Sequence, residues 1–255
     1  MMMVLGRSVV DSDGVESLAI LRALAHNHEV ARGYGKGTRA VFKAYLGGAT
    51  LSEATRSLWP EGSRGNGAAV RTPPIACRFA WNETKLDYYA RASALATHSH
   101  PDAIDAALIT ARLVAACIRN GRLEPKALFV GSIRDLKGSN LLTGMMKVQR
   151  LIETENVTTR EVLSELGAST VAAESVPLAV YAALRFLDRP TDALRFALTA
   201  GGDTDTISAI VGAIVGAANG QRAWPSGLLS RLEGRDVLRE QAKTLVKRGM
   251  PTAFA

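Results

Sequence analysis

The most informative segment of the chain is Gly201-Gly202-Asp203-Thr204-Asp205-Thr206. Its two adjacent glycines allow the backbone to turn tightly and to come close to a ligand. Two carboxylates two residues apart, together with a threonine hydroxyl, are oxygen ligands of the kind that Mg²⁺, Mn²⁺ and Ca²⁺ prefer. An apolar run follows directly and places the segment at a helix N-terminus, where free N–H groups and the helix dipole favour anions. The segment therefore predicts a divalent-cation site at the start of a helix.

The helix that follows is rich in small residues. They recur every four positions, at Ser208, Gly212, Gly216 and Gly220, and alanines lie beside them at positions 209, 213 and 217. Each glycine inside a helix costs up to about 1 kcal/mol relative to alanine. We therefore expect the glycine face to pack very closely against a neighbouring backbone, in a helix at the centre of the fold.

Two other interpretations explain the segment less well. One aspartate could simply cap a buried helix, but a cap accounts for neither the paired glycines nor the second aspartate. An EF-hand would need a periodic third ligand and a glutamate at the twelfth loop position, and the sequence has neither.

Composition and charge restrict the class of protein. The chain has 255 residues, of which 47% are hydrophobic, so a large core is expected and disorder is not. No apolar run is long enough to cross a bilayer and residues 1–7 do not resemble a secretory signal, which predicts a soluble, cytoplasmic protein without membrane contact. Cys77 and Cys117 lie in separate apolar patterns and are expected to be buried, reduced thiols.

The net charge of +7 and the isoelectric point of about 9.7 suit an anionic partner. The basic residues are nevertheless scattered, and aromatic residues make up only 5% of the chain. Nucleic acid is therefore not indicated beyond the basic isoelectric point, and no feature indicates an oligomeric state.

Helical periodicity dominates the chain, and no segment alternates with period two. Capping-box spacing at Thr50 and Thr158 and a His-Pro-Asp start at His100 mark helix N-termini. Helices are expected over residues 15–24, 51–59, 101–118, 159–166, 173–187, 190–199, 205–218 and 235–247. The pattern predicts one all-helical domain over residues 1–255, with about ten helices or more.

The motifs together resemble those of the ADP-ribosylglycohydrolase family. The resemblance rests on residues 201–213 and on three further motifs in the same order. These are Arg64-Gly65-Asn66-Gly67-Ala68-Ala69-Val70-Arg71, Thr97-His98-Ser99-His100-Pro101 and Glu174-Ser175-Val176-Pro177. The resemblance implies an orthogonal multi-helix bundle.

The resemblance also implies a metal-dependent hydrolase that cleaves the bond between ADP-ribose and an acceptor side chain. Mg²⁺ or Mn²⁺ would be the cofactor, with Asp203, Asp205 and Thr206 among the ligands. ADP-ribose would lie against Gly65, Asn66, Gly67, His98 and the pair Gly201 and Gly202. Backbone N–H groups at a glycine-rich helix start suit a diphosphate, and a carboxylate would assist proton transfer. Asp205 and Asp13 are the candidates for that catalytic carboxylate.

Basic residues beside the Gly-Asn-Gly motif leave alternatives open. Arg64 could bind phosphate, or it could be solvated or paired with a neighbouring acid, and for Arg71 the second interpretation is favoured. His98 could contact ribose or adenine, although a histidine at a junction of helices is more often a capping or packing residue. His100, before a proline, is expected to be structural.

The N-terminal part departs from the family pattern. Members usually have a Gly-Asp-Ala segment with a later glutamate, and this chain is expected to begin after it. A second acidic stretch has its best counterpart in Asp11-Ser12-Asp13-Gly14. Asp11, Ser12 and Asp13 are therefore candidate metal ligands, although the cluster could equally cap a helix. Two ions are implied by the resemblance, and one is the more secure expectation because so few carboxylates remain.

Three functions are consistent with these features. The first is an active hydrolase of ADP-ribosylated protein. The second is a degenerate homologue that binds ADP-ribose or a related nucleotide without hydrolysing it, which the altered acidic cluster favours. The third is an interaction protein that keeps only the bundle, against which the complete 201–206 segment argues.

Overall fold

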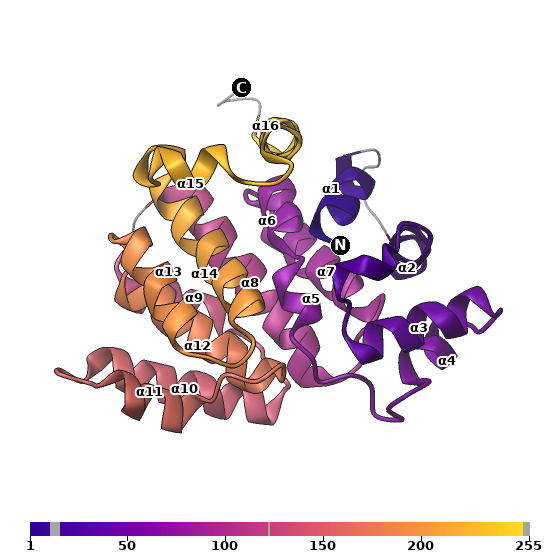
Figure 1. The fold of residues 1–255 in the computed structure, drawn as a ribbon, viewed down its shortest axis with the longest axis horizontal. Helices are drawn as coiled ribbons and strands as arrows, with labels where there is room; N and C mark the ends of the chain where they lie inside the picture. The colour runs from indigo at the N-terminus through magenta and orange to yellow at the C-terminus, as the bar shows by residue number, and fades with distance from the viewer. Residues whose placement is uncertain (11–15, 122, 252–255) are drawn as a thin grey trace.

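A computed structural model describes residues 1–10, 16–121 and 123–251 of the chain, and these residues are helical almost throughout. They form sixteen α-helices and two short 3-10 helices, and no strand occurs among them. An isolated β-bridge joins Gly65 to Val171. The all-helical prediction is confirmed (Figure 1). The α-helices are α1 Met2–Val10, α2 Ser17–His26, α3 Lys36–Leu46, α4 Leu51–Arg56, α5 Gly67–Val70, α6 Pro73–Phe79, α7 Glu83–Leu95, α8 Pro101–Asn120, α9 Pro125–Ser132, α10 Ser139–Glu153, α11 Thr159–Leu166, α12 Ala172–Arg185, α13 Pro190–Thr199, α14 Thr204–Asn219, α15 Ser226–Ser230 and α16 Arg235–Gly249.

Local capping chemistry explains several helix starts. Thr50 and Thr158 each form a complete capping box with the glutamate three residues later, as the sequence predicts. His100 caps α8, its Nδ1 accepting from the N–H of Asp102 at 3.2 Å, and this confirms a structural role for His100. α4 ends at Arg56, a few residues before the predicted end at residue 59.

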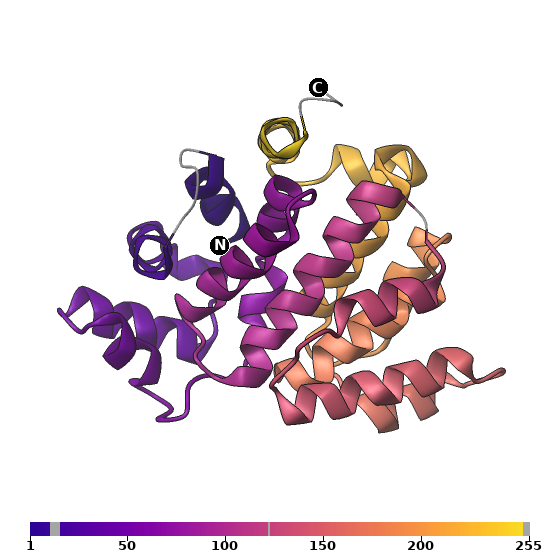
Figure 2. The same ribbon diagram turned by 180° about the vertical axis from the view of Figure 1, so that it is seen from behind.

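Helix α8 lies at the centre of the molecule. It is twenty residues long and mostly buried, and it contacts α5, α6, α7, α12 and α14. Around it, α1–α4 lie at one end of the molecule and α10–α13 at the other, which Figure 1 and the reverse view in Figure 2 both show. This arrangement brings the segments before α5, before α12 and before α14 together.

Helix α14 is central, as predicted, but its glycine face does not approach another backbone. Its buried side chains are the five bulky ones, Ile207, Ile210, Val211, Ile214 and Val215. A Cβ added at Gly212 would lie 3.8 Å from a methyl of Leu194, and one at Gly216 would lie 3.8 Å from the Trp224 ring. These are ordinary van der Waals distances, so the prediction of unusually close packing at the glycines is wrong.

The last long helix packs beside the first. α16 contacts α1 and α6, and the side-chain amide of Gln241 donates to the carbonyl of Met3 at 3.0 Å. Arg78 in α6 donates to the carbonyl of Arg248 at 2.6 Å. Helices from the N-terminal part of the chain, α1 and α6, and the last helix, α16, therefore pack together on one side of the fold (Figure 1).

No helix in the described part of the chain is both long and apolar enough to span a membrane. Neither cysteine is in a disulfide, and burial raises the pKa of Cys77 to about 11 and that of Cys117 to about 12. Cys117 is buried and Cys77 partly so, and both thiols stay protonated and unreactive at neutral pH.

Candidate functional site

Three segments that are distant in sequence meet at the start of α14. The N–H of Asn66 donates to Thr170 at 3.0 Å, and the N–H of Ala172 donates to Arg64 at 2.8 Å. The N–H of Asp203 donates to the carbonyl of Ala168 at 2.8 Å. The backbone around residues 167–171 therefore joins the Gly-Asn-Gly motif to the 201–206 segment.

The paired glycines serve this junction. Gly201 and Gly202 have φ angles of +77° and +68°, in the left-handed region that favours glycine. A Cβ at Gly202 would also lie 2.0 Å from the carbonyl oxygen of Ala168, whereas one at Gly201 would meet open space. The close approach at Gly202 is thus to the chain's own backbone, and it fixes where Asp203 stands.

Asp203 occupies the N-cap position of α14 but makes no capping bond with its side chain. Its Oδ2 instead accepts from the Asn66 amide at 2.6 Å. The interpretation of this aspartate as a simple helix cap is therefore wrong. Asp205, two residues on, is exposed, and its Oδ1 accepts from the N–H of Thr206 at 2.8 Å.

The two carboxylates interact directly. Burial raises the pKa of Asp203, and the neighbouring Asp205 raises it further, whereas the Asn66 hydrogen bond opposes the rise. The pKa of Asp205 is lowered, first by its hydrogen bond with Asp203 and then by the N–H of Thr206. Two adjacent carboxylates repel each other, and a bound cation would offset that repulsion. The carboxylate oxygens of Asp203 and Asp205, with the hydroxyl of Thr206 beside them, are oxygen ligands of the kind that a divalent cation prefers.

The candidate ligands Asp11, Ser12 and Asp13 lie outside the described residues. Within the described ranges, no group of three or more histidine, cysteine or acidic side chains is arranged to hold a metal ion. Of the candidate carboxylate ligands, Asp203 and Asp205 lie within the described residues.

Asn66 is buried between the aspartate and α12. Its side-chain amide donates to Asp203 and also to the hydroxyl of Ser175, at 3.0 Å. Because an amide has two N–H donors, both are used within the chain. Sequence reasoning proposed Asn66 as a ligand-binding residue, and the structure places it against a candidate metal ligand.

His98 packs underneath the glycine motif. Its Nε2 would lie 3.3 Å from a Cβ at Gly65, and its Cε1 would lie 3.3 Å from one at Gly67. The other ring nitrogen, Nδ1, pairs with the Thr97 hydroxyl at 2.7 Å. Burial, with a contribution from the Arg71 charge, lowers the pKa of His98 to about 3. The ring is neutral at physiological pH and supports the motif, and its contact with a ligand stays a prediction.

The glycine motif uses two backbone donors internally. The N–H of Gly65 donates to the Ser63 hydroxyl at 3.2 Å, and that of Asn66 is taken by Thr170. The motif therefore offers fewer N–H groups to a diphosphate than its sequence suggests.

Arg71 is fully buried, and neither expectation, phosphate binding or a solvated or acid-paired guanidinium, describes it. Its guanidinium donates to the Ser93 carbonyl, to the Ser93 hydroxyl at 3.3 Å and to the Gly67 carbonyl at 3.3 Å. Burial lowers its pKa to about 9. The prediction of a solvated or acid-paired arginine is wrong because Arg71 directly follows α5 and its side chain reaches carbonyls in the last turn of α7. Arg64, in contrast, is exposed and pairs with Glu61 at 3.3 Å, so the acid-paired interpretation describes it.

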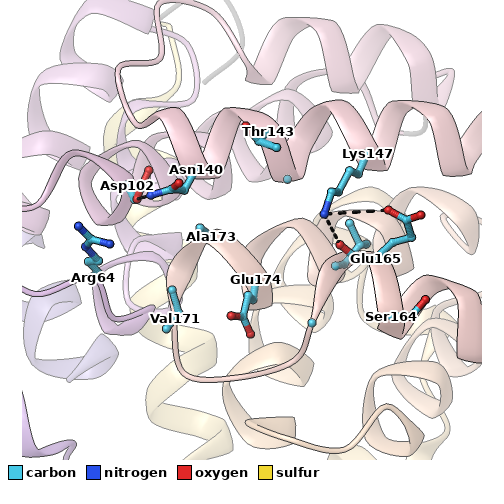
Figure 3. Close-up of a pocket in the computed structure, with 13 residues that line it drawn as sticks. Arg64, Asp102, Asn140, Thr143, Lys147, Ser164, Glu165, Val171, Ala173 and Glu174 are labelled. Carbon is cyan, nitrogen blue, oxygen red and sulfur yellow. Dashed lines mark hydrogen bonds and ion pairs between the residues drawn. The ribbon is translucent and has the colours of Figure 1, made fainter.

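A cavity of about 550 Å³ adjoins the same junction. Figure 3 shows Arg64 at one end and the contact between Lys147 and Glu165 at the other. Gly167, Val171 and Glu174 also line it, so the segment that holds Asp203 on one side forms a wall of the cavity on the other.

Sequence reasoning missed most of these cavity residues. Lys147 donates to the carbonyl of Glu165 at 2.7 Å, and Asp102 accepts from Asn140 at 3.1 Å and from the N–H of Leu141 at 3.1 Å. Glu174 was quoted only as part of a motif. Nothing in the local sequence of α10 or α11 marks these side chains, because they meet only when the helices pack.

Comparisons with known proteins agree with the fold and the motifs. The sequence model of the family described as ADP-ribosylglycohydrolase matches residues 1–253. The chain is 30% identical to ADP-ribosylhydrolase ARH3 of Homo sapiens over 233 residues, which are 80% of this chain and 64% of that protein. It is also 30% identical to ADP-ribosylhydrolase ARH3 of Danio rerio over 256 residues, which are 88% of this chain and 68% of that protein. The chain thus spans about two thirds of the length of these relatives.

A solved structure supports the architecture. A chain of an "ADP-ribosylglycohydrolase-related protein complex" superimposes with a TM-score of 0.73, covering 98% of this chain and 80% of that one, at 23% identity. At this level of identity the likeness establishes the fold and not the chemistry. The predicted bundle type is therefore confirmed.

Proposed function

Because this chain belongs to the ADP-ribosylglycohydrolase family, we propose that it is a divalent-cation-dependent hydrolase that removes ADP-ribose from an acceptor side chain of a protein. The observation that carries the proposal is the position of Asp203 and Asp205 at the start of α14, where Asn66 of the Gly-Asn-Gly motif donates to Asp203. Asp203 makes no capping bond with its side chain, and two adjacent carboxylates suit a cation.

Asp203, Asp205 and Thr206 would hold Mg²⁺ or Mn²⁺. When bound, the cation supplies electrostatic stabilisation of the negative charge on oxygens around the reacting carbon. In the reaction the bond from the ribose C1″ to the acceptor breaks, water adds its oxygen to C1″, and the acceptor takes up a proton. Asp205 is the more exposed carboxylate, so it is the better placed of the two to receive a proton from the attacking water.

The substrate would approach across the junction of the three segments. We propose that ribose lies at the carboxylates and that the rest of ADP-ribose extends along Gly65 and Gly67 toward Arg64. Arg64 is exposed at the edge of the cavity, and its partner Glu61 is exposed as well. A phosphate can therefore replace Glu61 on this guanidinium at little cost in desolvation.

A second candidate is a homologue that binds ADP-ribose without hydrolysing it. The feature that favours it is the Asp11-Ser12-Asp13-Gly14 stretch, which keeps only part of the acidic cluster that is usual in the family. A site with two carboxylates can bind a cation weakly and still leave the water without activation.

Release of free ADP-ribose distinguishes the two candidates. Peptides mono-ADP-ribosylated on arginine or serine are incubated with the protein, with and without Mn²⁺. For the hydrolase we expect release that requires Mn²⁺ and that falls by at least about 100-fold in Asp203→Ala and Asp205→Ala. The control is Asp236→Ala, an exposed aspartate at the start of α16. ADP-ribose that binds but is never released from a peptide would establish the second candidate instead.

A further inference from the structure

The Asp203 carboxylate stands at the end of a buried chain of side-chain hydrogen bonds. Ser175 in α12 donates through its hydroxyl to the carbonyl of Val171 at 2.9 Å. The same hydroxyl oxygen accepts from the Asn66 amide at 3.0 Å, and that amide donates to Asp203 Oδ2 at 2.6 Å. We call this series of bonds the Ser175–Asn66–Asp203 relay.

The relay can adopt only one orientation. The single hydroxyl hydrogen of Ser175 is directed to Val171, so its oxygen must face a donor. If the Asn66 amide were flipped, its oxygen would stand 2.6 Å from a carboxylate oxygen and would lose its bond to Ser175. The contact with Asp203 is also a charge-assisted bond, which is shorter and stronger than a neutral one.

Closing the loops does not require the relay. Three backbone bonds already join these segments: those of Asn66 and Ala172, which form the bridge between Gly65 and Val171, and the bond from Asp203 to Ala168. Ser175 is nevertheless fully buried and Asn66 nearly so, which places costly polar groups where apolar ones would pack. Because backbone bonds already close the loops, we explain the burial of Ser175 and Asn66 by their contact with the Asp203 carboxylate.

We propose that Ser175 and Asn66 are positioning residues that hold the Asp203 carboxylate in the orientation in which it binds the divalent cation. The relay fixes one carboxylate oxygen, Oδ2, and makes no use of the other. Groups that orient a metal ligand in this way affect metal affinity by about 10- to 100-fold when they are removed. The inference rests on the cation site of the proposed function.

The test measures the affinity of the whole chain for Mn²⁺ alone, by electron paramagnetic resonance of the free ion. Ser175→Ala removes the first member of the relay and leaves Asp203, Asp205 and Thr206 in place. We expect its dissociation constant for Mn²⁺ to rise about 10-fold, and that of Asn66→Ala to rise by more. Asn66→Ala is the second variant in case the buried serine is needed for folding.

Ser132→Ala is the matched control. Ser132 is equally buried, and its hydroxyl donates to a carbonyl of its own helix, at Phe129, at 2.7 Å. It lies in α9 and has no contact with the relay. We expect this variant to lose a comparable amount of thermal stability without metal and to keep the wild-type affinity for Mn²⁺.

The outcomes separate the inference from the proposed function. If Ser175→Ala and Asn66→Ala bind Mn²⁺ as the wild type does, the positioning role is wrong, and the hydrolase proposal is unaffected. If the wild type binds Mn²⁺ and the variants do not, but no ADP-ribose is released from any peptide, the relay stands and the hydrolase proposal fails. A wild type that binds no Mn²⁺ would overturn the cation site and the relay together.

Discussion

Asp203 and Asp205 are chemically identical residues that the fold makes unequal. Asp203 is shielded between the loop at Ala168 and Asn66, whereas Asp205 faces water on the first turn of α14. The sequence predicts that both are ligands, because carboxylates two residues apart suit a cation. The difference in their surroundings depends on residues more than thirty and more than a hundred positions away, so it was not predictable from the motif alone.

His98 provides a prediction about pH at the residue scale. Its pKa is about 3 in the folded chain because of burial, against about 6.5 for an unperturbed histidine. Between these values the unfolded chain binds a proton that the folded chain excludes. The stability that depends on a neutral His98 is therefore fully present above pH 6.5 and is lost as the pH falls toward 3.

Urea unfolding at a series of pH values measures this effect. We expect the contribution of His98 to the free energy of unfolding to fall by about 1.3 kcal/mol between pH 7.5 and pH 5.5. His98→Asn keeps a polar partner for Thr97 and removes the titration, so its stability should depend less steeply on pH over that range. Equal slopes for the variant and the wild type would show that the pKa of His98 is the same in the folded and the unfolded chain.

At the scale of the element, helix starts were the most predictable features. The boxes at Thr50 and Thr158 and the start at His100 were each specified within four residues, and each is confirmed. The function of the glycines in α14 was not predictable, because it depends on what stands opposite them. At Gly212 and Gly216 the neighbours are the flexible side chain of Leu194 and the edge of Trp224, and there is room for a methyl group.

Gly212→Ala and Gly216→Ala should therefore stabilise the protein. Alanine is favoured over glycine inside a helix by about 0.8–1 kcal/mol, and neither new methyl group meets an atom closer than 3.8 Å. Chemical denaturation of each variant measures the change in the free energy of unfolding.

Gly144→Ala in α10 is the contrasting variant. A Cβ there would lie 2.7 Å from the Pro177 ring and 2.9 Å from the carbonyl of Ala173. We expect this variant to lose about 1–3 kcal/mol, because α10 must move away from α12. If all three substitutions destabilised the protein equally, the glycines of α14 would be packed as closely against their neighbours as Gly144 is, and the expected stabilisation would be wrong.

At the scale of the whole molecule, the topology explains why the site could be only half predicted. The segments 64–67, 168–175 and 201–206 are brought together because α5, α12 and α14 all pack near α8. The family resemblance depends on the order of these motifs in the sequence. The backbone bonds among them exist only in the folded chain and could not be predicted from that order. Asn66 and Ser175 belong to quoted motifs, yet the bond between them joins residues 109 positions apart.

The packing of α16 beside α1 and α6 leads to a prediction about the whole domain. The sequence predicts a single domain, so the chain should unfold in one cooperative transition. Leu245 is the one buried side chain that the structure describes in α16, with 1% of its surface exposed. Leu245→Ala should lower the free energy of unfolding by about 2–4 kcal/mol through the lost contacts and the cavity left behind.

Calorimetry decides whether α16 belongs to the same cooperative unit as the site. If it does, Leu245→Ala shifts one transition to lower temperature, and Mn²⁺ at saturating concentration raises that same transition, because the ion binds only the folded state. Leu228→Ala is the control, since Leu228 in α15 is 56% exposed and should change stability by less than about 0.5 kcal/mol. Two separate transitions, with only the later one raised by Mn²⁺, would show instead that α16 unfolds independently and that the cation site resides in a smaller unit built around α8.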